Sequence, residues 1–442
     1  MLMVRHVLHK NILIHNFIKL STMKSFHSIE KGIAIIYDDI FLVNGARTPF
    51  GKLSGTLGRV SPTDLGIYAS KAALKRASVN PDQIDQVVVA NIGQSSTDAY
   101  FLPRHILLYS GVPQNVPAIM VQRICGSGFE TIITGAEQIL LGKALTTLCT
   151  GTENMTLSPT VSYGNRLGYA LGRPNFQDML WESLNDTAAG YPMGFTAENV
   201  AKKYNISRKE VDVFALRSFA AANAARNRGF FDEEITAVNS AVFEADGLVP
   251  RKVRLPRGVE NFKTDENARS TNLEKLAKLP PVFGKEGVQT AGNSSGIVDG
   301  AASVVVAAKS VVNAHKLNVL TKVLASSSCG IDPKFMGLAP VPAIRLLLEI
   351  TGLKLAEIGL IEINEAFAAQ YIGCEKELGF DREIANVNGG AIAIGHPLGA
   401  TGVRLSLTLS REMNLRKVKY GIASACIGGG QATAILFENP NL

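Results

Sequence analysis

Short apolar segments alternate with helical segments along much of the chain, and this alternation constrains the fold most. The continuous β-branched run over 86–90 is typical of a strand buried on both faces. Residues 62–77 begin with proline and repeat apolar residues every three or four positions, which predicts a helix. Further predicted elements are strands over 39–44, 118–124 and 145–150 and a helix over 128–142. Such alternation favours a layered α/β fold with a mixed or parallel sheet.

The alternation stops from about residue 158 to residue 291, where the chain is more polar. The elements predicted there are helices over 196–204 and 208–228 and a basic loop over 264–281. Ser207 is placed as the N-cap of the second helix, with Glu210 at its third position. We interpret residues 158–282 as an inserted loop domain.

After residue 291 the alternation returns. The predicted elements are a buried strand or helix over 301–308, helices over 341–349 and 366–378, a strand over 359–363, and a terminal hairpin over 420–426 and 433–437. We therefore expect a leader over 1–38, an N-terminal half over 39–157 and 283–306, and a C-terminal half over 307–442. A faint echo aligns TLCTGTE, which begins at Thr147, with SACIGGG, which begins at Ser424, but alone it does not establish a repeat.

The N-terminal segment carries four Lys and Arg residues and no acidic residue before Glu30. Without them the formal net charge of +7 falls by four to +3, which leaves no basic stripe for a nucleic-acid partner. The segment is typical of a mitochondrial transit peptide, which would direct the protein to the matrix. If it has no targeting role, with translation from Met3 or Met23, we expect a cytoplasmic protein. Its apolar runs are too short for an integral membrane segment.

The chain has an odd number of cysteines and no CxxC pair, which argues against a disulfide framework, a zinc ribbon or any other metal site. The cysteines are Cys125, Cys149, Cys329, Cys374 and Cys426. After the leader, the histidines are His105, His315 and His396. Any chemistry that pairs a cysteine with a histidine therefore has few candidates.

Cys125 lies in RICGSG, between a predicted strand and a predicted helix. At such a corner the sulfur meets the free N–H groups of a helix N-terminus, which favour an anion. We expect this position to lower the pKa of the thiol and to make a nucleophilic thiolate at neutral pH. The alternative is a small buried thiol that packs against a sheet.

His396 lies in NGGAIAIGHPLGATG, a glycine-dense loop that precedes a helix. Glycine allows close approach between backbone and ligand, although a lone histidine is often simply packed. A phosphate-binding loop is excluded because the Lys-Ser/Thr ending is missing.

Cys426 begins CIGGGQ, a glycine-rich turn. Its backbone N–H groups could point into one cavity and form an oxyanion hole, or the turn is only a tight hairpin. Asn364, in NEAF, is either a helix N-cap or a residue that orients a water. All these residues lie at predicted strand ends, where open α/β sheets place their sites.

Taken together, these motifs resemble the thiolase family. The similarity runs from about Leu42 to Phe437 and includes, in family order, VNGARTPFGK, RICGSGF, MGFTAENVA, TAGNSSGIVDGAA, INEAFAAQ, NVNGGAIAIGHPLGATG and CIGGGQA. The resemblance implies a five-layered α-β-α-β-α duplication with an inserted loop domain.

The resemblance also implies roles. Cys125 is the acylated nucleophile and His396 takes its proton, while Cys426 is the second acid and base. Asn364, through a water, forms one oxyanion hole with His396. The backbone N–H groups of Cys125 and Gly428 form the other.

Three further residues match positions that bind coenzyme A in the family: Ser295, Arg269 and Met193. Coenzyme A and acyl-CoA are expected as substrates, with no permanently bound cofactor, and a homodimer or homotetramer is expected. Acetoacetyl-specific members usually have histidine before Met-Gly, where this chain has Pro192. That difference favours thiolytic cleavage of 3-ketoacyl-CoA in fatty-acid breakdown over an acetoacetyl-CoA-specific acetyltransferase.

Two other classes remain for comparison. A non-catalytic, thiolase-like acyl-CoA or lipid carrier would not need Cys125, His396 and Cys426 together. A condensing enzyme of the ketoacyl-synthase type would use a cysteine with two histidines, or with histidine and asparagine. His105 and His315 lie outside suitable motifs, and Cys426 would have no role in that enzyme.

Overall fold

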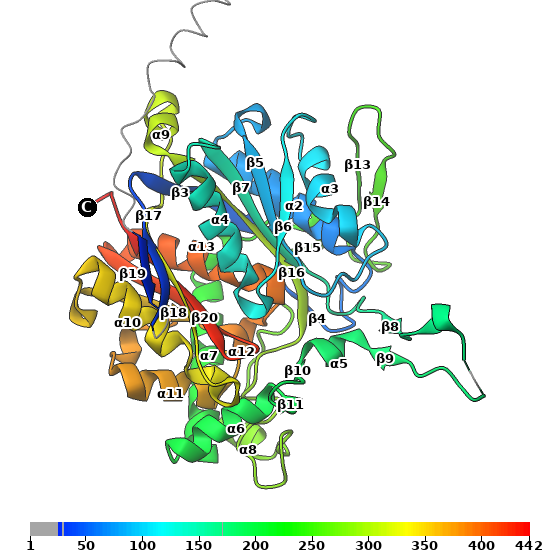
Figure 1. The fold of residues 1–442 in the computed structure, drawn as a ribbon, viewed down its shortest axis with the longest axis vertical. Coiled ribbons are helices and arrows are strands. Elements are labelled where there is room, and N and C mark those ends of the chain that lie inside the picture. The colour runs from blue at the N-terminus through cyan, green and yellow to red at the C-terminus, as the bar shows by residue number, and fades with distance from the viewer. Residues whose placement is uncertain (1–24, 29–30, 170) are drawn as a thin grey trace, which may run out of the picture.

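The strands of the N-terminal half form one layer of a mixed 12-stranded sheet, with helices on both faces of the layer (Figure 1). This computed structural model describes residues 25–28, 31–169 and 171–442. The elements of the half are β3 (Ile40–Arg47), β4 (Gly51–Lys52), α2 (Pro62–Ala77), β5 (Gln86–Ala90), α3 (Leu102–Tyr109), β6 (Ala118–Val121), α4 (Ser127–Leu140), β7 (Thr146–Glu153) and β16 (Val298–Ala308). The strand order is β3-β16-β7-β5-β6, with β5 parallel to β6 and β7. The segment that was predicted as either strand or helix is thus a strand, β16.

The C-terminal half repeats this order. Its elements are β17 (Thr321–Gly330), α10 (Pro340–Thr351), β18 (Leu360–Ile363), α11 (Ala368–Leu378), α13 (Leu398–Arg416), β19 (Tyr420–Ile427) and β20 (Gln431–Glu438). The order β17-β20-β19-β18 matches β3-β16-β7-β5, and β18 is parallel to β19 as β5 is to β7. A single parallel bridge between Ile361 and Ala385 lies where β6 pairs with β5 in the other half. The duplication implied by the resemblance is therefore present.

The strand registers show which positions of the two halves correspond. Ala90 pairs with Gly151, and Ile363 pairs with Ser424. The residue after each first strand is an asparagine, Asn91 or Asn364. The two halves therefore present the same residue type at this strand end.

The same registers align the ends of β7 and β19. Glu153 and Cys426 each lie two residues beyond the paired Gly151 and Ser424, so they correspond. The sequence similarity between TLCTGTE and SACIGGG aligned Cys149 with Cys426 instead. That alignment differs by four residues (153 − 149) from the one that the strand registers give. The cysteines of the two halves are thus not equivalent.

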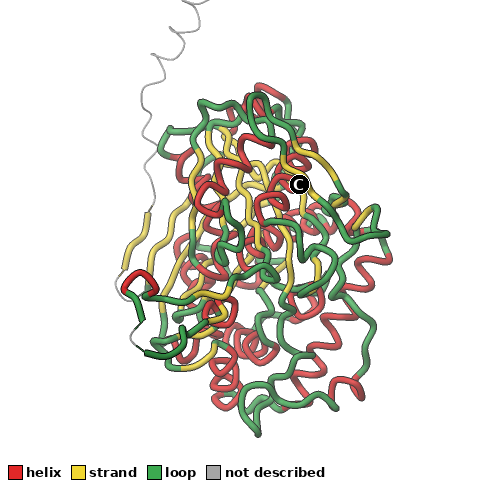
Figure 2. The backbone as a smooth tube through the Cα atoms, turned by 90° about the vertical axis from the view of Figure 1, so that its right-hand side faces the viewer, coloured by secondary structure: helices red, strands yellow, loops and turns green. Residues whose placement is uncertain are grey.

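The strands of the two halves form two sheet layers that are joined where β17 pairs with β3. Helices α4 and α13 lie between these two layers and form the central layer of the molecule. Their apolar side chains share one cluster with β16, β19 and β20. The helix backbones touch: a Cβ on Gly128 would lie 2.6 Å from the Gly402 nitrogen, and one on Gly402 would lie 2.1 Å from the Phe129 nitrogen. Helices α2 and α10 cover the outer faces of the two sheet layers, which makes five layers (Figures 1 and 2).

The predicted insertion contains short hairpins and helices. The elements are β8 (Thr160–Val161), β9 (Gln177–Asp178), α5 (Met179–Ser183), β10 (Asn185–Asp186), β11 (Tyr191–Pro192), α6 (Gly194–Lys203), α7 (Arg208–Asn227), β12 (Val238–Asn239), β13 (Ala241–Phe243), β14 (Arg251–Val253), β15 (Asn261–Phe262) and α8 (Leu273–Ala277). Helix α8 interrupts the predicted loop, and β8 and β9 form an arm that projects from the body (Figure 1). The capping box of Ser207 and Glu210 on α7 is confirmed. Helix α7 packs in the core of the C-terminal half, and the domain boundaries stay a prediction.

The chain before β3 also joins the sheet. β1 (Ser25–Ser28) pairs with β2 (Gly32–Ile36), and β2 pairs with β17. Tyr37 is fully buried, and its hydroxyl lies 2.8 Å from that of Ser326. The predicted leader over 1–38 therefore overlaps with the sheet, first at β1 and again from Gly32 onward, while residues 1–24 lie outside the described part. Within the described residues, no helix combines the length and the apolar character needed to cross a bilayer.

Candidate active site

Cys125 lies on a tight elbow between β6 and α4. It is the middle residue of a 3-10 turn, Ile124–Gly126, that leads directly into the helix. Ile124 has a φ of +42°, a left-handed conformation that is strained for a β-branched residue. The Ser127 hydroxyl stabilises the elbow because it accepts from the Arg123 N–H and donates to the Ile124 carbonyl, both at 2.7 Å. The cysteine is thereby held at the start of α4, as predicted.

The expected lowering of the Cys125 pKa is wrong. Burial raises the pKa of this thiol to about 11, against the opposing effect of two backbone N–H groups, those of Gly428 and of Cys125 itself, which hydrogen-bond to the sulfur. Removal of the thiol from water outweighs these two hydrogen bonds. Cys125 is therefore a thiol at neutral pH, and it needs a base when it attacks.

His396 is a buried, neutral imidazole with a defined tautomer. Its Nδ1 lies 2.6 Å from the Thr401 hydroxyl, which itself donates to the Pro397 carbonyl at 3.0 Å. The hydroxyl has only one proton, so it accepts from Nδ1–H, and the lone pair is on Nε2. Burial, followed by the positive charge of Arg404, lowers the pKa of His396 to about 3. The ring is thus uncharged at neutral pH and able to accept a proton at Nε2.

Asn364 lies directly beside this nitrogen. Its Nδ2 is 3.3 Å from Nε2 of His396, and its backbone N–H donates to the Ser424 carbonyl at 2.9 Å. The N-cap alternative is wrong, because α11 begins at Ala368 with Phe367 as the N-cap. The Asn364 Oδ1 is buried and has no hydrogen-bond partner among the described residues. A buried polar atom of this kind is available to a water or a ligand.

Cys426 is the last residue but one of β19, and a turn of three glycines follows Ile427. Gly429 and Gly430 have φ values of 81° and 76°, so this turn is also the tight hairpin that was considered as the alternative. The N–H of Gly428 points at the Cys125 sulfur. Burial raises the Cys426 pKa well above its usual value, and the nearby Cys125 raises it further. The two cysteines and Gly428 therefore form one cluster.

Two of the three residues predicted to bind coenzyme A border this cluster. Met193 packs against Cys426, and a Cβ on Gly428 would lie 2.8 Å from the Met193 sulfur. Ser295 donates its N–H to the Ala366 carbonyl at 2.9 Å. The next residue, Gly296, accepts the His396 N–H at 2.9 Å.

The third residue, Arg269, is exposed, and its guanidinium lies 5.6 Å from the centre of the Phe219 ring. No described contact joins it to the cysteines. Two residues before it, however, Asn267 donates to the carbonyls of Ile392 and Ala393 at 3.1 and 3.0 Å, in the chain that leads to His396.

Sequence reasoning missed several residues of the site. Thr401, which orients His396, lies within the quoted GHPLGATG motif, and its spacing of five residues from the histidine was an available signal. Glu153, at the end of β7, had no signal of its own, because its role depends on a helix start more than 240 residues away. Met336 packs in one apolar cluster with Cys426 and belongs to a segment that is distant from it in sequence.

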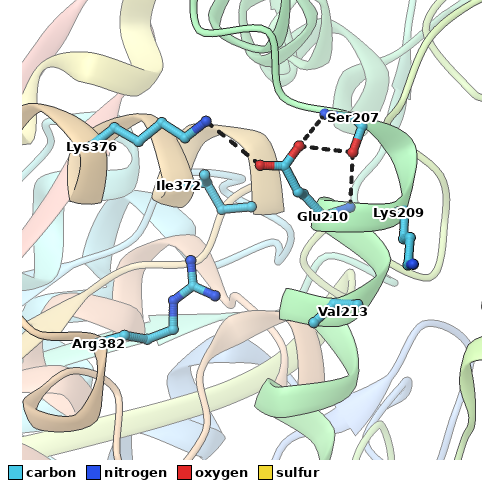
Figure 3. Close-up of a pocket in the computed structure, with 7 residues that line it drawn as sticks. All are labelled: Ser207, Lys209, Glu210, Val213, Ile372, Lys376 and Arg382. Atoms are coloured by element: carbon cyan, nitrogen blue, oxygen red, sulfur yellow. Dashed lines mark hydrogen bonds and ion pairs between the residues drawn. The ribbon is translucent and has the colours of Figure 1, made fainter.

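The surface pocket in Figure 3 contains none of the predicted site residues. It lies between α7 and α11 and has a volume of about 260 Å³. Its Lys376 pairs with Glu210 at 3.6 Å, and Arg382 pairs with Glu375. Two of its cations are thus already neutralised within the protein, which makes the pocket a poor anion site.

A duplicated five-layered α/β fold whose central helices begin at a buried cysteine and a buried histidine defines the thiolase class of acyltransferases. Comparison with known proteins agrees. The family model of the thiolase N-terminal domain matches residues 40–310, and that of the C-terminal domain matches residues 317–439. The chain belongs to the thiolase family.

Named relatives and solved structures cover almost the whole chain. Mitochondrial 3-ketoacyl-CoA thiolase of Bos taurus is 43% identical over 90% of this chain and 98% of its own length. Acetyl-CoA acetyltransferase of Escherichia coli is 41% identical over 90% and 99%. The crystal structure of human mitochondrial 3-ketoacyl-CoA thiolase superposes with a TM-score of 0.86 at 42% identity, covering 91% of this chain and 98% of that one.

Proposed function

We propose that the chain is a 3-ketoacyl-CoA thiolase, an acetyl-CoA C-acyltransferase that works through an acyl group on Cys125. The observation that carries this proposal is that the site holds both a buried thiol, to which two backbone N–H groups hydrogen-bond, and a neutral histidine whose Nε2 is unprotonated. Coenzyme A and acyl-CoA are the substrates. A solved relative, human mitochondrial 3-ketoacyl-CoA thiolase, binds coenzyme A.

The first half-reaction cleaves the carbon–carbon bond. The Cys125 sulfur attacks the 3-keto carbon, and its proton passes to Nε2 of His396. The bond between C2 and C3 then breaks, which leaves an acyl thioester on Cys125 and the enolate of acetyl-CoA. The Cys426 thiol protonates that enolate, and acetyl-CoA leaves. A high pKa suits Cys426 to this task because it holds the proton until a strong base forms.

The second half-reaction regenerates the enzyme. The thiol of coenzyme A gives its proton to the Cys426 thiolate and attacks the acyl group. Cys125 leaves and regains its proton from His396. The covalent intermediate divides one difficult step into two easier ones.

Two sets of donors are suited to hold the oxyanions. The N–H groups of Cys125 and Gly428 hydrogen-bond to the sulfur, so they lie next to the carbon that this sulfur would attack and could receive the oxygen of its tetrahedral intermediate. Asn364 and His396 lie together beside Cys426, and a water on Asn364 would complete a site for the enolate oxygen. Removal of one such donor costs about 3 to 4 kcal/mol in related acyl transfers.

An acetoacetyl-CoA-specific acetyltransferase is the second candidate, and relatives named acetyl-CoA acetyltransferase support it. Pro192 argues for the broader substrate range. It pairs with Asn185 in the small hairpin before Met193, where it has neither an imidazole nor an N–H to offer the substrate. A non-catalytic carrier remains the alternative of another class.

Thiolysis of 3-ketoacyl-CoA esters of several chain lengths, with free coenzyme A as acceptor, tests the proposal. We expect cleavage of four-carbon and longer esters. If no ester is cleaved, the enzyme proposal fails and the carrier alternative gains. If only the four-carbon ester is cleaved, the acetyltransferase replaces the 3-ketoacyl-CoA thiolase.

We further propose a mitochondrial matrix enzyme. Relatives named as mitochondrial support this alternative, and they do not support a cytoplasmic protein, which was the first expectation. Sequencing the N-terminus of the mature protein tests it: a mature chain that still begins at Met1, Met3 or Met23 would contradict an imported, processed enzyme.

A homodimer or homotetramer is supported by β6. This strand forms the edge of the large sheet, and its Ile119 is 43% exposed. An open edge of this kind can pair with a second copy. Light scattering on the purified protein measures the state, and a monomer at micromolar concentration would contradict it.

A further inference from the structure

Glu153 is a buried acid that the proposed reaction does not use. It ends β7 at the position that corresponds to Cys426 in the other half, and it is fully buried. Burial raises the pKa of its carboxyl to about 7. Among the described residues no Lys, Arg or His pairs with it, and the nearby charged group Asp299 is also acidic. An acid without a cationic partner is costly to bury, so its hydrogen bonds should explain its position.

Four N–H groups meet this carboxylate. Oε1 accepts from Asn91 Nδ2 at 3.0 Å and from the Gly93 N–H at 2.8 Å. Oε2 accepts from the Ile92 N–H at 3.2 Å and from the Gly399 N–H at 3.0 Å. Three donors thus come from the loop after β5, and one comes from the opposite half of the molecule.

The bond from Gly399 caps helix α13. The N-cap residue of this helix, Pro397, makes no side-chain cap, and the first N–H groups of a helix have no partner within it. A carboxylate at a helix N-terminus is also favoured by the helix dipole. Glu153 therefore supplies the missing cap from the N-terminal half.

The cap joins surfaces that approach very closely. A Cβ on Gly151 would lie 2.0 Å from the Gly399 carbonyl oxygen, and one on Gly399 would lie 2.7 Å from the Thr152 carbonyl oxygen. The start of α13 therefore rests on the backbone of β7. Glu153 acts at the point where the two halves meet.

The two segments that hydrogen-bond to Glu153, the loop after β5 and the start of α13, both lie close to the proposed reacting residues. Ile92 and Leu398 pack against Cys125 in one small apolar cluster. His396 lies two residues before Leu398, directly before Pro397. A shift of the α13 start would therefore move the base relative to the nucleophile.

We propose that Glu153 is a positioning residue for acyl transfer, which caps α13 across the two halves and thereby fixes His396 relative to Cys125. The inference rests on the roles proposed above for these two residues. Glu153 touches neither substrate nor reacting atoms in this role.

Two substitutions separate the reach of the side chain from its charge. Glu153→Gln keeps the length but turns an amide N–H₂ toward N–H donors, while Glu153→Asp keeps the charge but is one methylene shorter. We expect either to lower kcat by about 10²-fold with KM unchanged, the loss that a displacement of about 1 Å causes. The matched control is Asp299→Asn, at a buried acid that binds Thr156 and not α13. Its kcat should stay within about twofold of the parent value.

The alkylation rate of Cys125 provides the readout that a purely structural role would not change. Loss of the Glu153 charge removes a group that disfavours the Cys125 thiolate. Alkylation of Glu153→Gln by iodoacetamide should therefore become faster at a given pH while kcat falls. Glu153→Asp should lower kcat with the alkylation profile unchanged. If Glu153→Gln does not fold, the aspartate variant carries the test by itself.

A kcat within about twofold of the parent in a folded variant would overturn the proposal. An equal loss of kcat in Asp299→Asn would also overturn it, because the effect would then follow from any buried acid near this site. Failure of the proposed function is a separate result, because the parent protein itself would then cleave no 3-ketoacyl-CoA ester, whatever the Glu153 variants do.

Discussion

The two halves of the molecule share a strand order but carry different chemistry at the same positions. In the N-terminal half the ends of β5 and β7 present Asn91 and Glu153. Asn91 donates to Glu153, and Glu153 also accepts a hydrogen bond from the start of α13. In the C-terminal half the ends of β18 and β19 present Asn364 and Cys426. Asn364 there has a buried oxygen without a partner and lies beside His396. One pair is saturated with hydrogen bonds, and the other remains available to a ligand.

This difference suggests how a duplicated fold can divide its work. In the proposed mechanism the N-terminal half contributes the nucleophile at the start of its own central helix, and its strand ends hold the opposite half. The C-terminal half would contribute the base, the second thiol and the amide with the unpartnered oxygen. The predictions below test that division, because substitutions in the two halves should impair different steps of the reaction.

Cys125→Ala should cause the largest loss. Without the nucleophile we expect thiolysis to fall on the order of 10⁵-fold or more, as in other enzymes that lose their nucleophile. Mass spectrometry should find no acyl group on the protein after incubation with acyl-CoA. An acylated Cys125→Ala protein would place the nucleophile elsewhere.

Cys426→Ala should lower kcat by about 10³- to 10⁴-fold, the range of a lost acid and base. Cys125 should still be acylated by acyl-CoA in this variant, because the group that leaves acyl-CoA is a thiolate, which departs without the Cys426 proton far more readily than an enolate does. Intact-protein mass spectrometry checks this. An unlabelled variant would contradict the division between the two halves.

The pH dependence of Cys125 alkylation tests the protonation states of Cys125 in one half and of His396 in the other. Because the pKa of this thiol is raised to about 11 and that of His396 is lowered to about 3, the pair is neutral at rest. The thiolate fraction should therefore rise about tenfold per pH unit between pH 7 and 10. Stopped assays with iodoacetamide measure this rise. A plateau near neutral pH would reveal a preformed thiolate–imidazolium pair instead.

Asn364→Ala should lower kcat about 10²- to 10³-fold, in the range of a lost oxyanion-hole donor. Asn91→Ala is its matched partner in the other half and should have a smaller effect, because Glu153 keeps three other donors. Steady-state kinetics of the two variants compare them directly. Equal losses would show that the strand ends of the two halves are not specialised.

Thr401→Val should have the smallest effect. The substitution removes the acceptor of the His396 Nδ1 proton and retains the shape of the side chain. One lost neutral hydrogen bond corresponds to about 1 kcal/mol, and we expect roughly a fivefold loss of kcat. An unchanged kcat would mean that packing alone orients the ring.

Much of the secondary structure was accessible from local patterns. The helix over 62–77 and the strand over 86–90 were predicted with the bounds that the structure has, because proline at the helix start and a β-branched run are local signals. The strand predicted over 118–124 ends at Val121, since Ile124 is drawn into the strained elbow. Helix α8 was missed because it is short and its apolar pattern is weak.

The candidate site could be predicted from the sequence only in part. Cys125, His396, Asn364 and Cys426 were proposed from small-residue motifs at strand ends, and the family match supports the class of reaction. The charge state of Cys125 was predicted in the wrong direction, because the helix N-terminus is visible in the sequence and burial is not. Glu153 was missed because its partner, Gly399, belongs to the other half.

By itself the sequence determined the kinds of element, the order in which they occur and the residues able to do chemistry. These follow from local periodicity, from turns that need glycine and from the scarcity of histidine and cysteine. The tertiary structure decided which half of the duplication presents saturated polar groups and which presents groups that are available to a ligand. Burial, the approach of α13 to β7 and the neutrality of His396 arise where distant segments exclude water together, and that exclusion depends on the whole fold.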